Sequence, residues 1–155
     1  MKNYQQKSVE TTSFQRDFKS SSVTRYMTTL NNLITVHRDT LITEVVEVLL
    51  EKEITGVPVL DHKGGLVGLI DDKDCLKVLF DIAYHNHPVE QSTAADYMTS
   101  VMKTITTEAN IVEVADIFLH TKYKRLLVLD SDGNLQGQIS RQDILRAIRD
   151  FNDNA

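Results

Sequence analysis

The sequence has little of what several classes of protein require. It has one cysteine, Cys75, so no internal disulfide can form, which fits a reducing compartment such as the cytoplasm. No apolar run is long enough to cross a membrane, and the polar N-terminus lacks the core of a signal peptide. Lysine and arginine total 17 against 22 acidic residues, which argues against nucleic-acid binding through phosphates. We therefore expect a cytoplasmic protein that binds neither a membrane nor nucleic acid.

Patterns for catalysis and metal binding are also missing from the sequence. No nucleophile with an activating base can be assembled with any confidence. The segment DSDGN (130–134) resembles the start of a calcium loop, but Arg141 occupies the twelfth place, where a carboxylate is needed. The histidines lie in a polar connector or singly along the chain: His37, His62, His85, His87 and His120. We predict no enzyme activity, no catalytic cofactor and no metal site.

What the chain does contain is an internal repeat. The segment RYMTTLNNLITV (25–36) is similar to the later segment DYMTSVMKTITT (96–107). Each is followed by apolar residues at helical spacing: Leu41, Val45, Val48 and Leu49, then Ile111, Ala115, Phe118 and Leu119. Asn110 and Glu113 predict a capping box at the start of the second run. Two predicted strands come next in each copy, joined by the turns DHKGG and DSDGN: 57–60, 66–70, 126–129 and 135–139.

Each copy then closes with a short loop that opens another helix, GLIDDKD (68–74) and GQISRQD (137–143). These helices have apolar faces: Leu76, Leu79, Phe80 and Ala83 in the first copy, Ile144, Leu145 and Ile148 in the second. Cys75 falls on one face with Leu79 and Ile82, which predicts that it packs in the core. Each copy therefore reads strand, helix, strand, strand, helix, and is too short to bury a sizeable core alone.

The order YMT, ITV, GVPVLD and GG-LVGLI with a following aspartate, together with its second copy later in the chain, resembles a tandem pair of CBS domains, called a Bateman module. The resemblance covers about residues 23–150 and implies an α/β fold of two repeats packed as a pseudo-twofold pair. The expected segments are a polar tail or accessory helix (1–22), repeat 1 (23–84), a linker (85–94), repeat 2 (95–150) and a C-terminal tail (151–155).

The resemblance also implies a function. Members commonly bind adenine nucleotides or related adenosyl ligands in clefts between the two repeats, form homodimers, and regulate an enzyme or channel. Here the regulated protein would be a separate chain. The expected ligand is AMP, ADP, ATP or S-adenosylmethionine, acting as a regulator. The alternative is a ligand-independent module for dimerisation and partner docking.

The loop of repeat 2 has the chemistry of a phosphate site. A helix start presents free backbone N–H groups to an anion, and Ser140 and Arg141 add a hydroxyl and a positive charge. In the family, the residue at the place of Asp143 accepts hydrogen bonds from the ribose hydroxyls. Ser140 and Asp143 also fit an ordinary helix cap, and the two interpretations are compatible.

Other residues of repeat 2 match family positions that line the ligand. Lys124 and Arg125 stand where members carry basic side chains that reach the phosphates, although a solvated turn after a helix explains them equally well. Thr104 matches a position in the nucleotide cleft. Met102 and Ile105 would cover an adenine face.

Repeat 1 departs from this pattern. Asp71 and Asp72 replace Ser140 and Arg141, and Gly56 replaces Arg125. The window from residue 44 to 81 carries a net charge of −5, whereas the window from 113 to 150 is neutral. We therefore predict the main site in repeat 2. For a weaker site at Asp71 and Asp74 we leave three alternatives open: it is empty, it selects a less charged adenosyl ligand, or it depends on Mg²⁺. Consecutive acids at a helix start also serve simply to complement the helix dipole.

Overall fold

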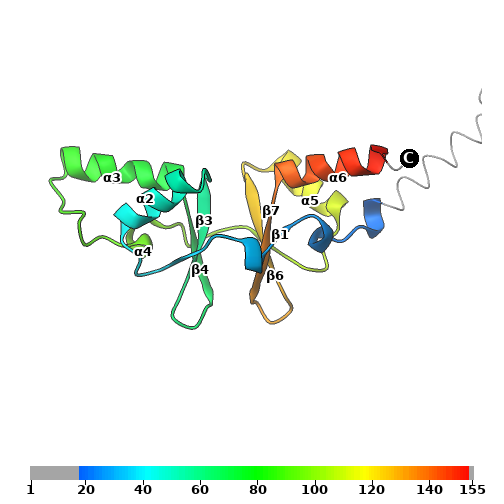
Figure 1. Ribbon diagram of the computed structural model, residues 1–155, viewed down its shortest axis with the longest axis horizontal. Coiled ribbons are helices and arrows are strands. Elements are labelled where there is room, and N and C mark those ends of the chain that lie inside the picture. The colour runs from blue at the N-terminus through cyan, green and yellow to red at the C-terminus, as the bar shows by residue number, and fades with distance from the viewer. Residues whose placement is uncertain (1–17, 154–155) are drawn as a thin grey trace, which may run out of the picture. The chain divides into compact units, whose positions relative to one another are not determined.

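The structure of the protein is a computed structural model, in which residues 18–153 are described (Figure 1). Residues 1–17, which make up most of the predicted N-terminal tail, and residues 154–155 lie outside the described residues. The helices and strands in chain order are η1 (Val23–Arg25), β1 (Thr28–Thr29), η2 (Leu30–Asn32), β2 (Val36–His37), α2 (Ile42–Glu51), β3 (Gly56–Leu60), β4 (Leu66–Asp71), α3 (Asp72–Tyr84), α4 (Ala94–Tyr97), β5 (Thr104–Thr106), α5 (Ile111–His120), β6 (Arg125–Leu129), β7 (Leu135–Ser140) and α6 (Arg141–Asp153).

The predicted order of strand, helix, strand, strand, helix is confirmed in both repeats. In repeat 1, β2 runs parallel to β3, and β3 pairs antiparallel with β4. In repeat 2, β5 runs parallel to β6, and β6 pairs antiparallel with β7. The two helices of each repeat, α2 with α3 and α5 with α6, lie side by side (Figure 1). The α/β fold with two repeats is therefore confirmed.

The compact units of the structure group the chain differently from the sequence repeat. The repeat-1 unit runs from Ile34 to Met102, and among the described residues the repeat-2 unit joins 18–33 to 103–153. The lead-in segment of repeat 1, its first residues up to Leu33, adds β1 to the repeat-2 sheet, where Thr28 pairs with Gln138. The lead-in segment of repeat 2, its first residues up to Met102, joins the repeat-1 unit, where Thr99 bridges Leu69. Each unit is thus completed by the lead-in segment of the other repeat.

Two glycines make room for these lead-in segments. A Cβ on Gly137 would lie 2.4 Å from the carbonyl oxygen of Thr28, and a Cβ on Gly68 would lie 2.5 Å from the sulfur of Met98. Both distances are shorter than van der Waals contact. The glycine that opens each repeated loop is therefore required by the close approach of a neighbouring chain segment.

Each unit has its own apolar core. In the repeat-1 unit, Ile42, Val45 and Ile70 are completely buried. In the repeat-2 unit, Val114 and Leu126 are completely buried. The core-facing residues of α2 and α5 differ in part from those predicted, because Leu119 is 80% exposed while Ile42 and Val114 take core positions.

The predicted turns and the predicted cap at α5 are present. Asp61 Oδ1 accepts from the Gly65 N–H at 2.8 Å, and Asp130 Oδ1 accepts from the Asn134 N–H at 2.8 Å. The side chain of Asn110 accepts from the Glu113 N–H at 2.9 Å, as a cap does. Glu113 itself contacts the Asn110 side-chain amide rather than the backbone, so the reciprocal half of the predicted capping box is wrong.

The two residues of α3 that were predicted to share a core face with Cys75 do not lie in the core. Cys75 does pack against the core of the repeat-1 unit, but Leu79 is 65% exposed and Ile82 is 52% exposed. In α6, Ile144 is buried whereas Leu145 and Ile148 are exposed. That helix also continues to Asp153, so the segment from residue 151, predicted as a tail, begins as helix.

Candidate functional site: the start of helix α6

The loop of repeat 2 places its three predicted residues at the junction of β7 and α6. Ser140 ends the strand, Arg141 begins the helix, and Asp143 lies in the first turn with 3% of its surface exposed. One carboxylate oxygen of Asp143, Oδ2, accepts from the Ser140 backbone N–H at 2.8 Å and from its hydroxyl at 3.1 Å. The other oxygen, Oδ1, accepts from the guanidinium of Arg146. Asp143 therefore holds the Ser140 end of the loop in place through hydrogen bonds to its backbone and its side chain.

This arrangement is only half of a capping box. The Ser140 hydroxyl is turned towards Asp143 as a donor and does not cap the helix. Within residues 18–153, the structure gives no acceptor for the backbone N–H groups of Arg141, Gln142 and Asp143. The start of α6 therefore keeps the free donors and the partial positive charge that an anion requires.

The start of α3 is built differently. Asp71 Oδ1 accepts from the Asp74 N–H at 2.8 Å, and Asp74 Oδ2 accepts from the Asp71 N–H at 3.1 Å, which completes a capping box. The Asp72 N–H donates to the carbonyl of Thr55 at 2.8 Å. The protein itself therefore satisfies this helix start with carboxylate and carbonyl oxygens, and leaves little for an anion to bind.

Asp74 is the buried acid of this closed cap, with 8% of its surface exposed. Burial raises the pKa of the Asp74 carboxyl, and the adjacent Asp71 carboxylate raises it further, while the Asp71 backbone N–H and Lys77 act in the opposite direction. The Thr99 hydroxyl also donates to its Oδ1 at 3.3 Å. Burial likewise raises the pKa of the Cys75 thiol to about 11, so Cys75 is a weak nucleophile.

The predicted basic residues of repeat 2 gather near the start of α6. Arg125 lies directly opposite Ser140 in the β6–β7 pairing, and its side chain is half-buried. Arg141 is exposed, and its guanidinium donates to the carbonyl of Tyr123 at 3.2 Å. Lys124 is exposed on the residue before Arg125. The structure thus brings Arg125, Ser140 and Arg141 to the same end of the repeat-2 sheet.

The predicted lining residues divide between the two compact units. Thr104 begins β5, pairs with Leu127 and is half-buried. Ile105 belongs to the core of the repeat-2 unit with 9% of its surface exposed, so most of its side chain is used in packing. Met102 is half-buried and belongs to the repeat-1 unit.

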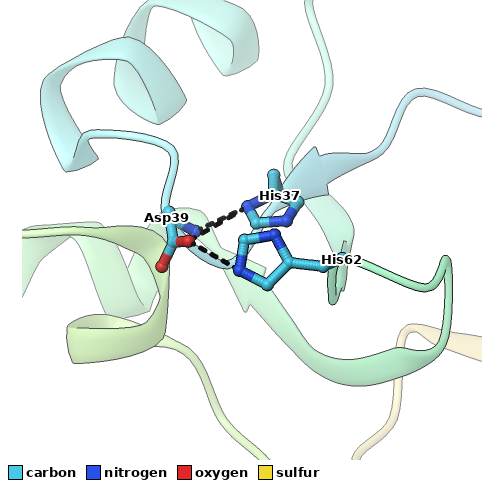
Figure 2. A group of neighbouring side chains, drawn as sticks. All are labelled: His37, Asp39 and His62. Atoms are coloured by element: carbon cyan, nitrogen blue, oxygen red, sulfur yellow. Dashed lines mark hydrogen bonds and ion pairs between the residues drawn. The ribbon is translucent and has the colours of Figure 1, made fainter.

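One group of polar residues escaped the sequence analysis. His37 and His62, which stand alone in the sequence, lie together with Asp39 in the repeat-1 unit (Figure 2). The parallel pairing of His37 with Leu60 brings the residues after β2 next to the turn after β3. The interpretation of these two histidines as isolated is therefore wrong. Applying the strand pairing to the residues just beyond each strand would have found the group.

No helix among residues 18–153 is both long enough and apolar enough to span a membrane.

Comparison with known proteins identifies the family of both repeats. The family model of the CBS domain matches residues 23–81 and 94–150. The CBS domain-containing protein CBSX1, chloroplastic, of Arabidopsis thaliana is 33% identical over 149 residues, which cover 81% of this chain and 63% of the relative. CBSX2 of the same plant is 31% identical over 146 residues, which cover 79% of this chain and 61% of the relative. The chain thus spans less than two thirds of the length of these relatives.

Solved structures share the fold. The crystal structure of CBSX2 in complex with AMP has a TM-score of 0.75 and 31% identity, and the match covers 86% of this chain and 99% of that chain. The crystal structure of CbpB in complex with c-di-AMP has a TM-score of 0.80 and 17% identity, covering 94% of this chain and 96% of that chain. The second similarity, at low identity, shows the fold alone.

Proposed function

The chain belongs to the CBS-domain family, and from this premise we propose that it is a non-catalytic regulatory module that binds an adenine nucleotide at the start of α6. The observation that carries the proposal is the set of backbone N–H groups at Arg141, Gln142 and Asp143, for which no described residue supplies an acceptor. A phosphate at this position would accept those hydrogen bonds and interact favourably with the helix dipole.

Side chains around this helix start supply the charge that a phosphate needs. Arg125 and Arg141 flank the loop, and a guanidinium pairs with phosphate oxygens through two parallel hydrogen bonds. Lys124, exposed beside Arg125, adds a third cation. The Ser140 hydroxyl exchanges its bond to Asp143 for a bond to the ligand by rotating about one torsion angle.

Asp143 is the proposed ribose acceptor. Its Oδ1 atom accepts a hydrogen bond from Arg146. The Arg146 side chain is 50% exposed, so its guanidinium can leave Asp143 and move into solvent. A carboxylate released in this way accepts both ribose hydroxyls, since each of its oxygens has two lone pairs. Thr104 and Met102 are proposed as further lining residues, and Ile105 contributes through the core behind them.

A similar structure in complex with AMP supports the choice of ligand. CBSX2, 31% identical to this chain, was crystallised with AMP. We propose AMP as the first ligand, with ADP, ATP and S-adenosylmethionine as competitors for the same site. The regulated protein is proposed to be a separate chain, and the module to act in the cytoplasm, although two relatives are named as chloroplastic.

Thermal unfolding of the full chain with a panel of ligands tests this proposal. A ligand that binds only the folded state at 100 times its Kd adds about 2.7 kcal/mol of stability. We expect AMP to raise the Tm, and adenosine, which lacks the phosphate, to raise it much less. Absence of any shift with AMP, ADP, ATP and S-adenosylmethionine, each at about 1 mM, would remove the basis for a nucleotide sensor.

A second function, dimerisation without a ligand, is favoured by the surface of α3. This helix exposes a set of large apolar residues: Leu76, Leu79, Phe80, Ile82 and Tyr84. Such a patch is expensive to leave in water and marks an interaction surface. We propose that it contributes to a homodimer.

Light scattering coupled to gel filtration tests the dimer. We expect the mass of a dimer for the unchanged chain without nucleotide, and that of a monomer for Leu79→Glu. Val112→Glu, at a partly exposed position of α5, is the control and should stay dimeric. A monomeric unchanged chain would contradict the dimer and leave the nucleotide proposal standing.

A further inference from the structure

Three metal-ligating side chains converge in the repeat-1 unit, away from the loop at the start of α3. His37 is the last residue of β2, Asp39 lies in the turn before α2, and His62 lies in the turn between β3 and β4. Figure 2 shows the three side chains pointing towards one another. Asp39 Oδ2 lies 3.2 Å from His62 Nε2 and 3.7 Å from His37 Nδ1. One ligand atom from each residue lies within 4.8 Å of the others.

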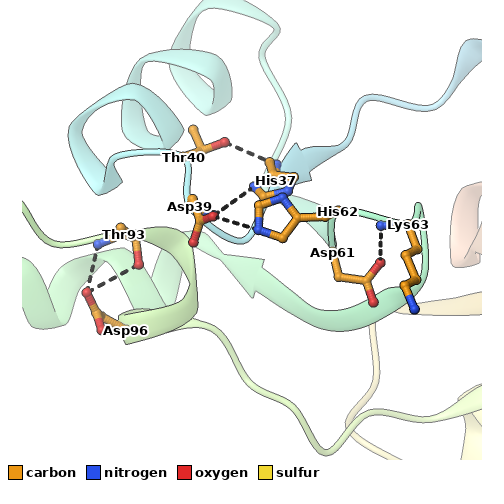
Figure 3. Close-up of polar contacts among 8 residues, drawn as sticks. All are labelled: His37, Asp39, Thr40, Asp61, His62, Lys63, Thr93 and Asp96. Carbon is orange, nitrogen blue, oxygen red and sulfur yellow. Dashed lines mark hydrogen bonds and ion pairs between the residues drawn. The ribbon is translucent and has the colours of Figure 1, made fainter.

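The backbone holds these side chains in place. The Arg38 N–H donates to the carbonyl of Leu60 at 2.8 Å, which ties the turn after β2 to the end of β3. The His37 N–H donates to the Thr40 hydroxyl at 3.1 Å, and the Thr40 N–H donates to the His37 carbonyl at 3.0 Å. Figure 3 shows Thr40 beside His37, and Asp61, which precedes His62, accepting from the Lys63 N–H. The positions of the ligand atoms are therefore set by strand pairing and tight turns.

From this geometry we propose that His37, Asp39 and His62 form a binding site for a zinc-class divalent transition metal ion. Two imidazoles and one carboxylate are ligands that zinc takes readily. Metal bonds of about 2.0–2.1 Å in a tetrahedron place neighbouring ligand atoms about 3.3 Å apart. The observed separations of 3.2 and 3.7 Å are close to this requirement.

A hydrogen bond orients the His37 ring for the same role. Its Nδ1 atom accepts from the Asp39 N–H at 3.0 Å, so the lone pair of this nitrogen points towards the turn that carries Asp39. A metal needs that lone pair, and it replaces the backbone N–H as its partner. The two imidazole rings lie 4.4 Å apart, and one nitrogen of each ring, His37 Nδ1 and His62 Nε2, faces Asp39.

Three protein ligands leave at least one coordination position open to solvent. The side chains of Asp39 and His62 are 59% and 75% exposed, so an ion can enter and keep a water ligand. Because the three residues come from two turns and a strand end, a bound ion links these parts of the repeat-1 unit. Binding therefore stabilises this unit against unfolding.

The matching positions of repeat 2 lack this chemistry. His37 pairs with Leu60 as Thr106 pairs with Leu129, which aligns the two repeats by strand register. On this alignment, Thr106, Glu108 and Ser131 stand where repeat 1 has His37, Asp39 and His62. With no imidazole at these positions, repeat 2 serves as an internal comparison.

Calorimetric titration of the full chain with zinc chloride, in a buffer that does not bind zinc, tests the site. We expect one ion per chain at this site and a Tm that rises with zinc. His37→Gln, Asp39→Asn and His62→Gln should each weaken zinc binding by at least about tenfold, since even residues that only support a ligand contribute about 10–100-fold. A cooperative thermal unfolding transition measured without zinc shows that each variant is folded.

His120→Gln is the matched control. His120 Nδ1 lies 3.2 Å from Asp116 Oδ1 in the repeat-2 unit, a histidine–carboxylate pair without a second histidine. This variant, and His85→Gln with His87→Gln in the connector, should bind zinc as the unchanged chain does. Cobalt(II) absorption should report a coordination sphere that changes when His62 is replaced. Zinc binding that is absent, or that His62→Gln leaves unaltered, would overturn the proposal.

Discussion

The starts of α3 and α6 follow the same repeated loop but differ in their hydrogen bonding. Among the described residues, acceptors are present for the first backbone N–H groups of α3 and not for those of α6. At α3, Asp71 and Asp74 cap each other, and the carbonyl of Thr55 accepts from Asp72. At α6, the Ser140 hydroxyl donates to Asp143 and leaves the first N–H groups of the helix without an acceptor among the described residues. The serine in place of an aspartate at the helix cap thus accompanies the difference between an open helix start at α6 and a mutually capped one at α3.

The repeats also differ at the end of the parallel strand pair, β2 with β3 in repeat 1 and β5 with β6 in repeat 2. Repeat 1 places His37, Asp39 and His62 together, whereas the same positions of repeat 2 carry no imidazole. The scaffold of strands, hairpin turns and loop glycines is the same in both. The same scaffold therefore carries different side-chain chemistry in its two repeats, basic residues around the start of α6 and two histidines with a carboxylate in repeat 1.

The largest expected effect separates the two buried aspartates. Asp143→Ala removes the proposed ribose acceptor and releases Ser140, so we expect it to abolish the rise in Tm with AMP. Asp74→Ala should leave most of that rise. Calorimetric titration of both variants measures the difference, and Asp143→Asn, which keeps the side-chain shape, controls for loss of the cap. Equal losses in the two alanine variants would contradict the asymmetry.

Exchanging the cap residues tests the same contrast by charge. Ser140→Asp combined with Arg141→Asp closes the α6 cap with carboxylates and removes a cation. We expect AMP affinity to fall by about 100-fold, because charged hydrogen bonds contribute about 1.5–3 kcal/mol and repulsion is added. The reverse exchange, Asp71→Ser with Asp72→Arg, is the matched control and should leave AMP binding at α6 intact. Unchanged affinity in the first variant would place the phosphate elsewhere.

The loop glycines provide a stability comparison. In Gly137→Ala the new methyl group meets the backbone oxygen of Thr28, which cannot rotate away, and we expect a loss of about 1–3 kcal/mol in the free energy of unfolding. In Gly68→Ala it meets mainly the flexible side chain of Met98, so the loss should be smaller. Denaturant unfolding measures both. A larger loss at Gly68 would contradict the account of how the lead-in segments pack.

The smallest effect is a pH dependence at the closed cap. Burial raises the pKa of Asp74, so the folded state holds this proton to a higher pH than the unfolded state, whose ordinary pKa is about 3.9. The group therefore destabilises the fold as pH rises through that window and ceases to do so as pH falls. Relative to Asp74→Asn, we expect the unchanged chain to be more stable near pH 4 than at pH 7. A difference that does not vary with pH would mean that Asp74 is not desolvated.

Sequence patterns predicted the repeat, its order of elements and the residues of the α6 loop, because these depend on local periodicity and turn chemistry. They failed where contacts are distant in sequence. The apolar residues Leu79 and Ile82 fit a core helix by spacing, yet they face solvent. No local sequence pattern predicts that each lead-in segment packs on the other unit. Gly68 and Gly137 lie where these segments make their closest contacts.

The placement of Ser140, Arg141 and Asp143 at a helix start was predictable from the sequence, but their hydrogen bonding was not. Both loops end in an aspartate three residues after the cap, and only the structure distinguishes a mutual cap at Asp71 from a one-sided one at Ser140. His37 and His62 were missed because they are 25 positions apart and meet only through the pairing of β2 with β3.

Backbone amide resonances during an AMP titration test the central claim most directly. If the phosphate occupies the open start of α6, the ¹H–¹⁵N signals of Arg141, Gln142 and Asp143 should move as AMP is added, since a new acceptor shifts each amide. Those of Asp72, Lys73 and Asp74 should stay in place. Movement confined to the α3 amides, or no movement at α6 under saturating AMP, would contradict the account.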